Sequence, residues 1–175
     1  MPRQAALLQG INVGSRRRVA MVELRALLEG LGYDDVRTYL QSGNVLLSSP
    51  TPSEQLAREL RQGISERLGF DVAVVVRSLD ELAAIVAGDP LAGVAVDPKL
   101  YQVSFLSAEP AADVVRAISA RDLAPEQVVF SGREIYAWHP DGIHSSPLAR
   151  LLSERRLGVS ATARNWRTVK ALLDL

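Results

Sequence analysis

Hydrophobic and polar positions along the chain follow two periods, one typical of buried strands and one typical of amphipathic helices. Short apolar runs bounded by glycine or turn formers predict strands at Gln4–Leu8, Val36–Leu40, Val45–Leu47 and Asp71–Arg77. Apolar residues three and four positions apart predict helices at Val19–Leu31 and Ser53–Leu68. Residues 41–44 are rich in turn formers, so the strands beside them should pair as a hairpin. The resulting order is β-α-β-β-α-β, the split βαβ pattern.

The same order of elements recurs in the second half of the chain. After a short helix at Leu79–Ala87, we predict a strand at Leu100–Leu106 and a helix at Ala111–Ala120. A hairpin of Val128–Phe130 with Ile135–Trp138 follows, and then a helix at Pro147–Leu157 that begins after Ser145 or Ser146. A strand at Val159–Ala161 and a closing helix at Asn165–Leu173 complete the chain. We therefore predict an α+β protein of two ferredoxin-like (βαββαβ) subdomains with antiparallel sheets. The boundary lies where Gly and Pro concentrate, which gives subdomains at residues 1–85 and 86–175.

Composition narrows the possible chemistry. Hydrophobic residues make up 47% of the 175-residue chain and aromatic residues only 5%, which predicts an aliphatic core. The absence of cysteine excludes disulfides, thiolate zinc sites and a cysteine nucleophile. Because no charged leader or long apolar segment is present, we expect a cytoplasmic protein with no membrane partner.

The first two strands of a split βαβ unit run in the same direction, so the loop after the first strand and the turn after the second should share one end of the sheet. The loop also leads into a helix N-terminus, which favours an anion. These segments predict a polar pocket of Asn12, Gly14, Ser15, Arg16, Arg17, Arg18, Ser42 and Asn44. The alternative is purely structural: the glycines allow unusual backbone angles, the asparagines bond their own turns and the arginines are solvated. Neither a P-loop nor a dinucleotide-binding fingerprint is present.

Charge is distributed unevenly although the net charge is zero, a balance that argues against a general polyanion binder. Residues 1–20 contain four arginines and no acid, and residues 140–175 contain six basic residues against three acidic ones. The two ends would form a local positive patch if they meet in space.

A second group of candidate residues lies near the C-terminus, in the segment Thr162–Trp166. Arg164 could bind a phosphate and Trp166 could stack on a base, as in single-strand nucleic-acid recognition. The alternative is that Trp166 packs in the core, with Thr162 or Asn165 as the cap of the closing helix.

The two histidines, His139 and His144, bracket a turn and have no third ligand at a suitable spacing, so we predict neither a metal site nor a cofactor. Ser145 and Ser146 lie beside His144, but a nucleophile turn of the Gly-x-Ser-x-Gly type is absent. We therefore interpret these residues as a coincidence rather than as a catalytic triad.

Four segments resemble those of a known family: residues 6–14 (ALLQGINVG), 21–28 (MVELRALL), 36–45 (VRTYLQSGNV) and 161–169 (ATARNWRTV). They resemble a bacterial family of uncharacterised proteins, domain of unknown function 1697, whose members open ALLRGINVGG and close TxRNW. The resemblance implies two α/β ferredoxin-like subdomains and brings no established activity. Two departures are Gln9, where such proteins have Arg, and Ser15, where they have a second Gly. The first departure weakens the case for catalysis here.

Three functions remain open, and we favour the first. It is a binding module for a phosphorylated or anionic ligand, either a nucleotide or a nucleic acid, at the rim formed by residues 10–18 and 41–44. The second is an enzyme acting on a small metabolite in a cleft between the halves, with Asn12, Ser42 and Asn44 as positioning groups and His139 or His144 as acid or base. The third is a protein-interaction or oligomerisation module; the residues predict no particular oligomeric state.

Overall fold

The computed structural model describes all 175 residues and divides them into two compact units. Unit 1 contains Met1–Ile85 and Leu172–Leu175, and unit 2 contains Val86–Ala171. The sequence placed the last four residues with the second half, whereas here they group with unit 1. Arg37 Nη1 donates a hydrogen bond to the backbone oxygen of Leu175, which ties the C-terminus to unit 1. No helix has both the length and the apolar character needed to cross a membrane.

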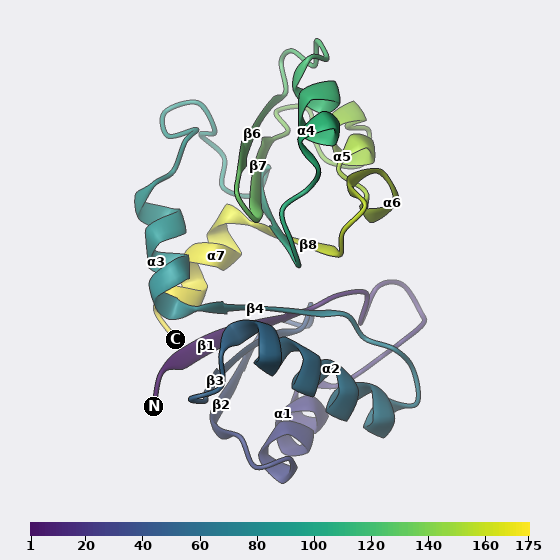
Figure 1. Ribbon diagram of the computed structural model, residues 1–175, viewed down its shortest axis with the longest axis vertical. Helices are drawn as coiled ribbons and strands as arrows, with labels where there is room; N and C mark the ends of the chain where they lie inside the picture. The colour runs from purple at the N-terminus through teal and green to yellow at the C-terminus, as the bar shows by residue number, and fades with distance from the viewer. The chain divides into compact units, whose positions relative to one another are not determined.

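Unit 1 contains the first half of the elements, in the predicted β-α-β-β-α-β order, followed by a third helix (Figure 1). They are β1 (Arg3–Leu8), α1 (Met21–Gly30), β2 (Asp34–Tyr39), β3 (Asn44–Ser48), α2 (Ser53–Leu68), β4 (Val74–Ser78) and α3 (Leu79–Ala87), which runs across the division between the units. The sheet has the order β2-β3-β1-β4 with antiparallel neighbours throughout. It follows that β1 and β2 run in the same direction and end at the same edge.

The core of unit 1 lies between its sheet and the helices α1 and α2, which cover one face (Figure 1). Alternate strand residues face these helices because side chains alternate across a strand. The helices contribute residues at helical spacing, including Leu24 and Leu28 from α1 and Leu56 and Leu60 from α2. The cluster is aliphatic, as the composition predicted.

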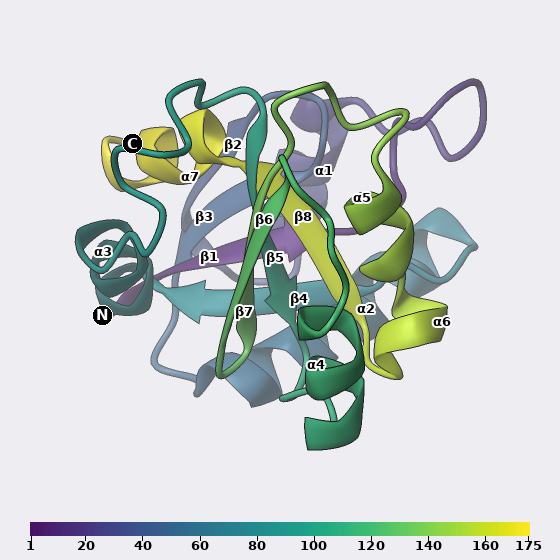
Figure 2. The same ribbon diagram turned by 90° about the horizontal axis from the view of Figure 1, so that it is seen from above.

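Unit 2 repeats the topology around a second antiparallel sheet, ordered β6-β7-β5-β8. Its elements are β5 (Tyr101–Leu106), α4 (Ala112–Ser119), β6 (Gln127–Ser131), β7 (Glu134–Trp138), α5 (Pro147–Leu151), α6 (Glu154–Leu157), β8 (Ala161–Asn165) and α7 (Trp166–Leu173), the last of which runs into unit 1. Ile118 of α4, Leu148 of α5 and Leu157 of α6 pack on the same face of this sheet. Figure 2 shows the four strands with these helices beside them.

Two elements of unit 2 differ from the sequence prediction. The single helix expected at 147–157 is divided into α5 and α6, because Ser153 adopts an extended conformation with ψ of 148°. The last strand lies at Ala161–Asn165 rather than at Val159–Ala161, and it pairs with β5 along its whole length. Its buried side chains, Thr162 and Arg164, are polar, so the sequence does not show the alternation of apolar and polar residues that predicts a strand.

Candidate functional site

The loop that follows β1 is held in place by the side chain of Asn12. Its Nδ2 donates to the backbone oxygens of Val19 (2.8 Å) and Gln41 (2.7 Å), and its Oδ1 accepts from the Val19 N–H at 2.8 Å. The Asn12 N–H donates to the Arg17 carbonyl at 3.0 Å, which closes the loop on itself. Both Nδ2 hydrogens are therefore used within the protein. Asn12 positions the loop and is not free to donate to a ligand.

The turn between β2 and β3 packs directly against this loop. Asn44 Nδ2 donates to the backbone oxygen at the end of β2 (2.8 Å) and to Ser42 Oγ (3.0 Å), while the Leu8 N–H donates to the Gly43 carbonyl at 2.9 Å. A Cβ on Gly43 would lie 2.8 Å from Ile11 Cδ1, and the φ of Gly43 is 83°. Only glycine satisfies both conditions at this position. The two sequence-predicted segments therefore form one rim, which we define as residues 10–18 and 41–44.

A third segment, residues 69–73, lies against the rim and was missed by the sequence reasoning. The Gln9 N–H donates to the Ala73 carbonyl at 2.9 Å. The guanidinium of Arg17 lies 5.5 Å from the centre of the Phe70 ring, and its Nη1 donates to the Asp71 carbonyl at 3.4 Å. The antiparallel pairing of β1 with β4 brings the start of β4 to this end of the sheet. The strand order alone was therefore enough to place it here.

The acidic group at this end of unit 1 is already paired. Arg61 donates to the two carboxylate oxygens of Asp71 at 2.8 and 2.5 Å. These hydrogen bonds hold the pKa of Asp71 below its usual range, and the positive charges of Arg61 and Arg17 act in the same direction. Asp71 is exposed, so its pair with Arg61 adds little stability, but this pair already balances the negative charge of Asp71.

The predicted residues Gly14, Ser15, Arg16, Arg17 and Arg18 all lie on the exposed part of this loop. Arg17 is fixed by its contacts with residues 70 and 71, whereas Arg16 and Arg18 make no hydrogen bond or ion pair. A guanidinium has five donors in a planar fork, which matches phosphate and carboxylate oxygens. The rim therefore presents two available cations beside one immobilised cation.

Arg164 and Trp166 belong to unit 2 and are both buried, each with 7% of its surface exposed. The Trp166 ring stacks on Tyr101 with centroids 4.8 Å apart and lies 6.5 Å from Tyr136. Arg164 Nη1 donates to Thr162 Oγ1 at 2.7 Å, and burial lowers the pKa of Arg164 to about 10. Trp166 therefore packs in the core, which was the structural alternative, and its ring is not open to a nucleic-acid base. Asn165 is the residue that caps the last helix, through its Oδ1 and the Thr168 N–H at 2.9 Å.

A buried polar network in unit 2 was also missed by the sequence reasoning. His139 Nδ1 lies 2.7 Å from Glu126 Oε2 and 2.8 Å from Ser146 Oγ, and Ser146 Oγ also donates to Glu126 Oε2. Glu126 Oε1 accepts from the Leu148 N–H at 3.1 Å, and Ser146 Oγ accepts from the Ala149 N–H at 2.9 Å. The network therefore fixes the N-terminus of α5.

This network does not have the geometry of a catalytic triad. Ser146 and Glu126 both contact the same nitrogen of His139, whereas a triad histidine contacts the serine and the acid through different nitrogens. His144 is exposed and makes no hydrogen bond to these residues. No group of three or more His, Asp or Glu side chains is arranged to hold a metal ion.

Comparison with known proteins identifies the family. The profile of the family described as protein of unknown function (DUF1697) matches residues 1–136. The chain belongs to this family. The match includes the whole rim but stops short of the motif at residues 161–169. The family description names no activity, and a search of curated proteins finds no match.

A solved structure extends the likeness to the whole chain. The conserved bacterial protein SP0830 from Streptococcus pneumoniae has the same fold, with a TM-score of 0.80 and 25% sequence identity. The alignment covers 99% of this chain and 97% of that protein. The fold of two successive α+β units is therefore shared by this DUF1697 protein and by SP0830 over almost their full lengths.

Proposed function

We propose that this DUF1697 protein is a binding module for a phosphorylated ligand, which contacts the rim of unit 1. The observation that carries the proposal is the combination of three consecutive exposed arginines with a loop backbone that Asn12 holds fixed. A loop of preset shape loses less conformational entropy on binding than a flexible one. Three adjacent cations would otherwise repel each other, and a bound phosphate removes that repulsion.

The three arginines have different parts in this proposal. Arg17 is held against Phe70 and the backbone of Asp71, so it sets the position of the loop relative to residues 69–73. Arg16 and Arg18 flank it, are exposed and keep all their donors available. We expect these two to make charge-assisted hydrogen bonds to phosphate oxygens, which are the stronger class of hydrogen bond.

The recognition we propose is of phosphate rather than of bases. Trp166, the aromatic residue suggested for base stacking, is packed against Tyr101. Phe70, the aromatic side chain next to the rim, carries the Arg17 guanidinium above its ring. With no free aromatic platform among these candidates, binding should depend on salt and only weakly on base identity.

The test is a fluorescence polarisation titration of the full chain with labelled decathymidylate. The variant Arg16→Gln, Arg17→Gln, Arg18→Gln removes the rim charges, and Arg150→Gln, Arg155→Gln, Arg156→Gln removes three exposed charges from α5 and α6 as a matched control. For the two phosphate contacts of Arg16 and Arg18, the affinity of the unaltered protein should fall ~7-fold between about 50 and 200 mM salt. The rim variant should lose this dependence, while the control keeps it.

Competition separates the two kinds of phosphorylated ligand. If the rim binds a small polyphosphate, inorganic tripolyphosphate should displace the labelled oligonucleotide at a concentration close to that of unlabelled decathymidylate. If it binds a nucleic-acid strand, tripolyphosphate should be much weaker because it is too short to contact the protein surface beyond the rim. Equal affinity of the rim variant and the control variant for decathymidylate would refute the proposal.

A further inference from the structure

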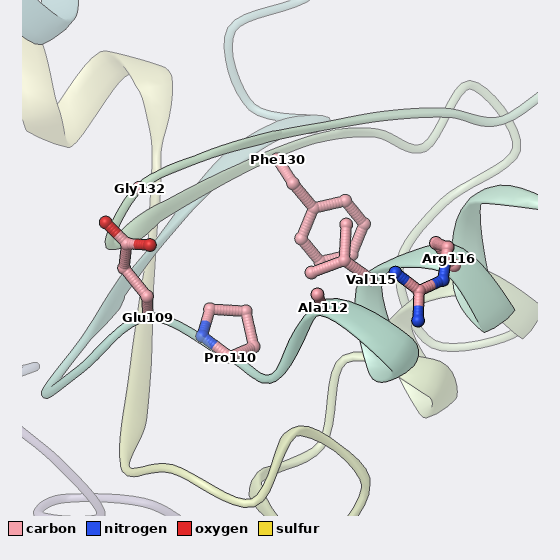
Figure 3. A pocket seen from close by; sticks show the side chains of 7 residues that line it. All are labelled: Glu109, Pro110, Ala112, Val115, Arg116, Phe130 and Gly132. Atoms are coloured by element: carbon pink, nitrogen blue, oxygen red, sulfur yellow. The ribbon is translucent and has the colours of Figure 1, made fainter.

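Unit 2 contains a cavity of about 360 Å³ that the rim proposal does not use (Figure 3). It is lined by Glu109, Pro110, Ala112, Val115, Arg116, Phe130 and Gly132. Figure 3 shows an apolar floor of proline, alanine, valine and phenylalanine side chains, with the Glu109 carboxylate at one end and the Arg116 guanidinium at the other. This size and lining are within the range of ligand sites in proteins.

The two charged residues of the cavity are available to a ligand. Glu109 and Arg116 are both exposed, and neither forms a hydrogen bond or an ion pair with the other or with a third group. Glu109 lies at the turn of the β6–β7 hairpin, because its Oε1 is 3.7 Å from where a Cβ on Gly132 would be. Because these opposite charges line one cavity without contacting each other, they leave space for a ligand that has a positive group for Glu109 and a negative group for Arg116.

The strand next to the cavity, β6, has an open edge. It is the outermost strand of its sheet and pairs only with β7. Ser131 and Glu134 flank the two-residue turn and exchange hydrogen bonds, so the alternation of an antiparallel pair directs the backbone N–H and C=O groups of Val128 and Phe130 outward. The Phe130 side chain lines the cavity, which places an open backbone edge and an apolar cavity side by side.

The equivalent strand of unit 1 shows how such an edge is normally protected. The outermost strand β2 carries three charged residues, Asp34, Asp35 and Arg37, and its pairing is interrupted by a register shift between Asp34 and Arg37. Charges and bulges are the usual means of preventing unwanted strand addition. In contrast, β6 reads Gln-Val-Val-Phe-Ser, with no charge and with continuous pairing to β7. The same topology thus has a protected edge in one unit and an unprotected edge in the other.

We propose that an extended peptide adds to the β6 edge as a further antiparallel strand and places one apolar side chain in the cavity. An antiparallel peptide begins at the hairpin turn, where Glu109 lies, and runs toward the other end of β6. Its charge order should therefore be basic, apolar, acidic, at alternate positions, so that the basic residue meets Glu109 and the acidic residue meets Arg116. A second copy of this chain is a poorer occupant, because β6 supplies no charged side chain for either residue.

The test is a titration of the isotope-labelled full chain by two-dimensional NMR with two capped peptides of the same composition. The probe is acetyl-Lys-Thr-Leu-Thr-Glu-amide and its control is the reversed peptide, acetyl-Glu-Thr-Leu-Thr-Lys-amide. We expect the probe to shift the amide signals of Val128 and Phe130 with saturation, and to bind several-fold more tightly than the reversed peptide. In the variant Glu109→Lys, Arg116→Glu, the preference between the two peptides should reverse.

A backbone variant tests the strand addition itself. Val128→Pro removes an outward N–H and leaves the β6–β7 ladder intact, so it should weaken binding of the probe about 5-fold, which is the loss of one hydrogen bond. If this variant does not fold, the exchange of the exposed charges at positions 109 and 116 still tests the proposal, because it leaves the backbone unchanged.

Three results would overturn the proposal. The first is that neither peptide shifts the β6 amides at about 5 mM, which excludes even a millimolar dissociation constant. The second is that the peptides shift only signals of the cavity residues and leave the Val128 and Phe130 amides unchanged, which would indicate a small-ligand site without strand addition. The third is that the β6 amides shift with protein concentration alone, which would show that a second copy occupies the edge.

Discussion

Replacing Glu126 tests whether the buried network with His139 and Ser146 stabilises unit 2. In Glu126→Leu, three donors lose their acceptor: the Ser146 hydroxyl, the His139 Nδ1–H and the Leu148 N–H. His139 can redirect its hydrogen to Ser146 Oγ, which is 2.8 Å away. Two donors then remain unsatisfied in a site where His139 and Ser146 are 1% and 3% exposed. At ~1–3 kcal/mol for each, the free energy of unfolding should fall by ~2–6 kcal/mol.

Glu126→Gln is the matched control, because the glutamine amide can satisfy the same partners. Its oxygen accepts from the Leu148 N–H, and its nitrogen donates to Ser146 Oγ. Ser146 then donates to His139 Nδ1, which becomes an acceptor when the histidine proton moves to Nε2. Only the charge assistance is lost, so we expect a destabilisation of ~1 kcal/mol.

Urea unfolding followed by tryptophan fluorescence measures both effects in the right unit, because the two tryptophans of the chain, Trp138 and Trp166, both belong to unit 2. With a slope of ~1–2 kcal/mol per molar urea, a loss of ~3 kcal/mol lowers the midpoint by ~2 M. Equal midpoints for the leucine and glutamine variants would refute the proposed hydrogen-bond assignment.

The same network predicts a pH dependence. Burial raises the pKa of Glu126, but the hydrogen bonds from Ser146, His139 and Leu148 outweigh burial and hold the pKa below its usual value. The folded protein therefore binds this proton less readily than the unfolded chain does. The resulting stability is complete above the unfolded pKa and is lost as the pH falls through the lower, folded pKa. The difference in midpoint between the unaltered protein and Glu126→Gln should shrink on acidification, and a difference that grows would contradict this sign.

Three further predictions concern the rim and the C-terminal motif. Gly43→Ala should cost ~2–5 kcal/mol by circular dichroism, because strain at positive φ adds to the clash with Ile11, whereas Gly14→Ala, which has no atom near its Cβ position, should cost only ~1 kcal/mol. Asn12→Ala should weaken decathymidylate binding although both hydrogens of the Asn12 amide nitrogen are used within the protein. Hydrogen exchange of the Val19 amide should become faster in parallel, and unchanged exchange would contradict the positioning role. Trp166→Ala should lower the stability of unit 2 by ~3–5 kcal/mol without a specific effect on oligonucleotide binding, whereas lost binding with unchanged stability would restore the base-stacking hypothesis.

The sequence predicted most of the fold because most elements have an apolar face or a turn residue at each end. α2 and α3 have the predicted bounds, and the two hairpins lie about the predicted turns. The predictions failed where polar residues are buried. Thr162 and Arg164 face inward on β8, so the sequence placed this strand too early, at Val159–Ala161 instead of Ala161–Asn165. The break at Ser153 between α5 and α6 was missed as well, because no change in the apolar pattern marks it. The serine itself is not diagnostic, since Ser is common both at helix starts and at exposed positions.

The candidate site was predictable in its location but not in the function of each residue. The parallel direction of β1 and β2 follows from topology, and it was sufficient to bring residues 10–18 and 41–44 together. Whether Asn12 and Asn44 face a ligand or their own turns depends on hydrogen bonds between residues up to 29 positions apart, which no local pattern encodes. The contact of Glu126 with Ser146, 20 positions away, is likewise visible only after the β6–β7 hairpin has formed.

The two units have the same sheet topology but differ in their exposed parts. In unit 1 the loop after the first strand is long and carries three arginines, and the outer strand β2 is protected by charge. In unit 2 the equivalent loop after β5 is short and leads through Glu109 and Pro110 into α4, and the outer strand β6 is uncharged. If both proposals hold, the rim variants should leave peptide binding unchanged and the Glu109 and Arg116 variants should leave oligonucleotide binding unchanged, since the two surfaces use separate residues of separate units.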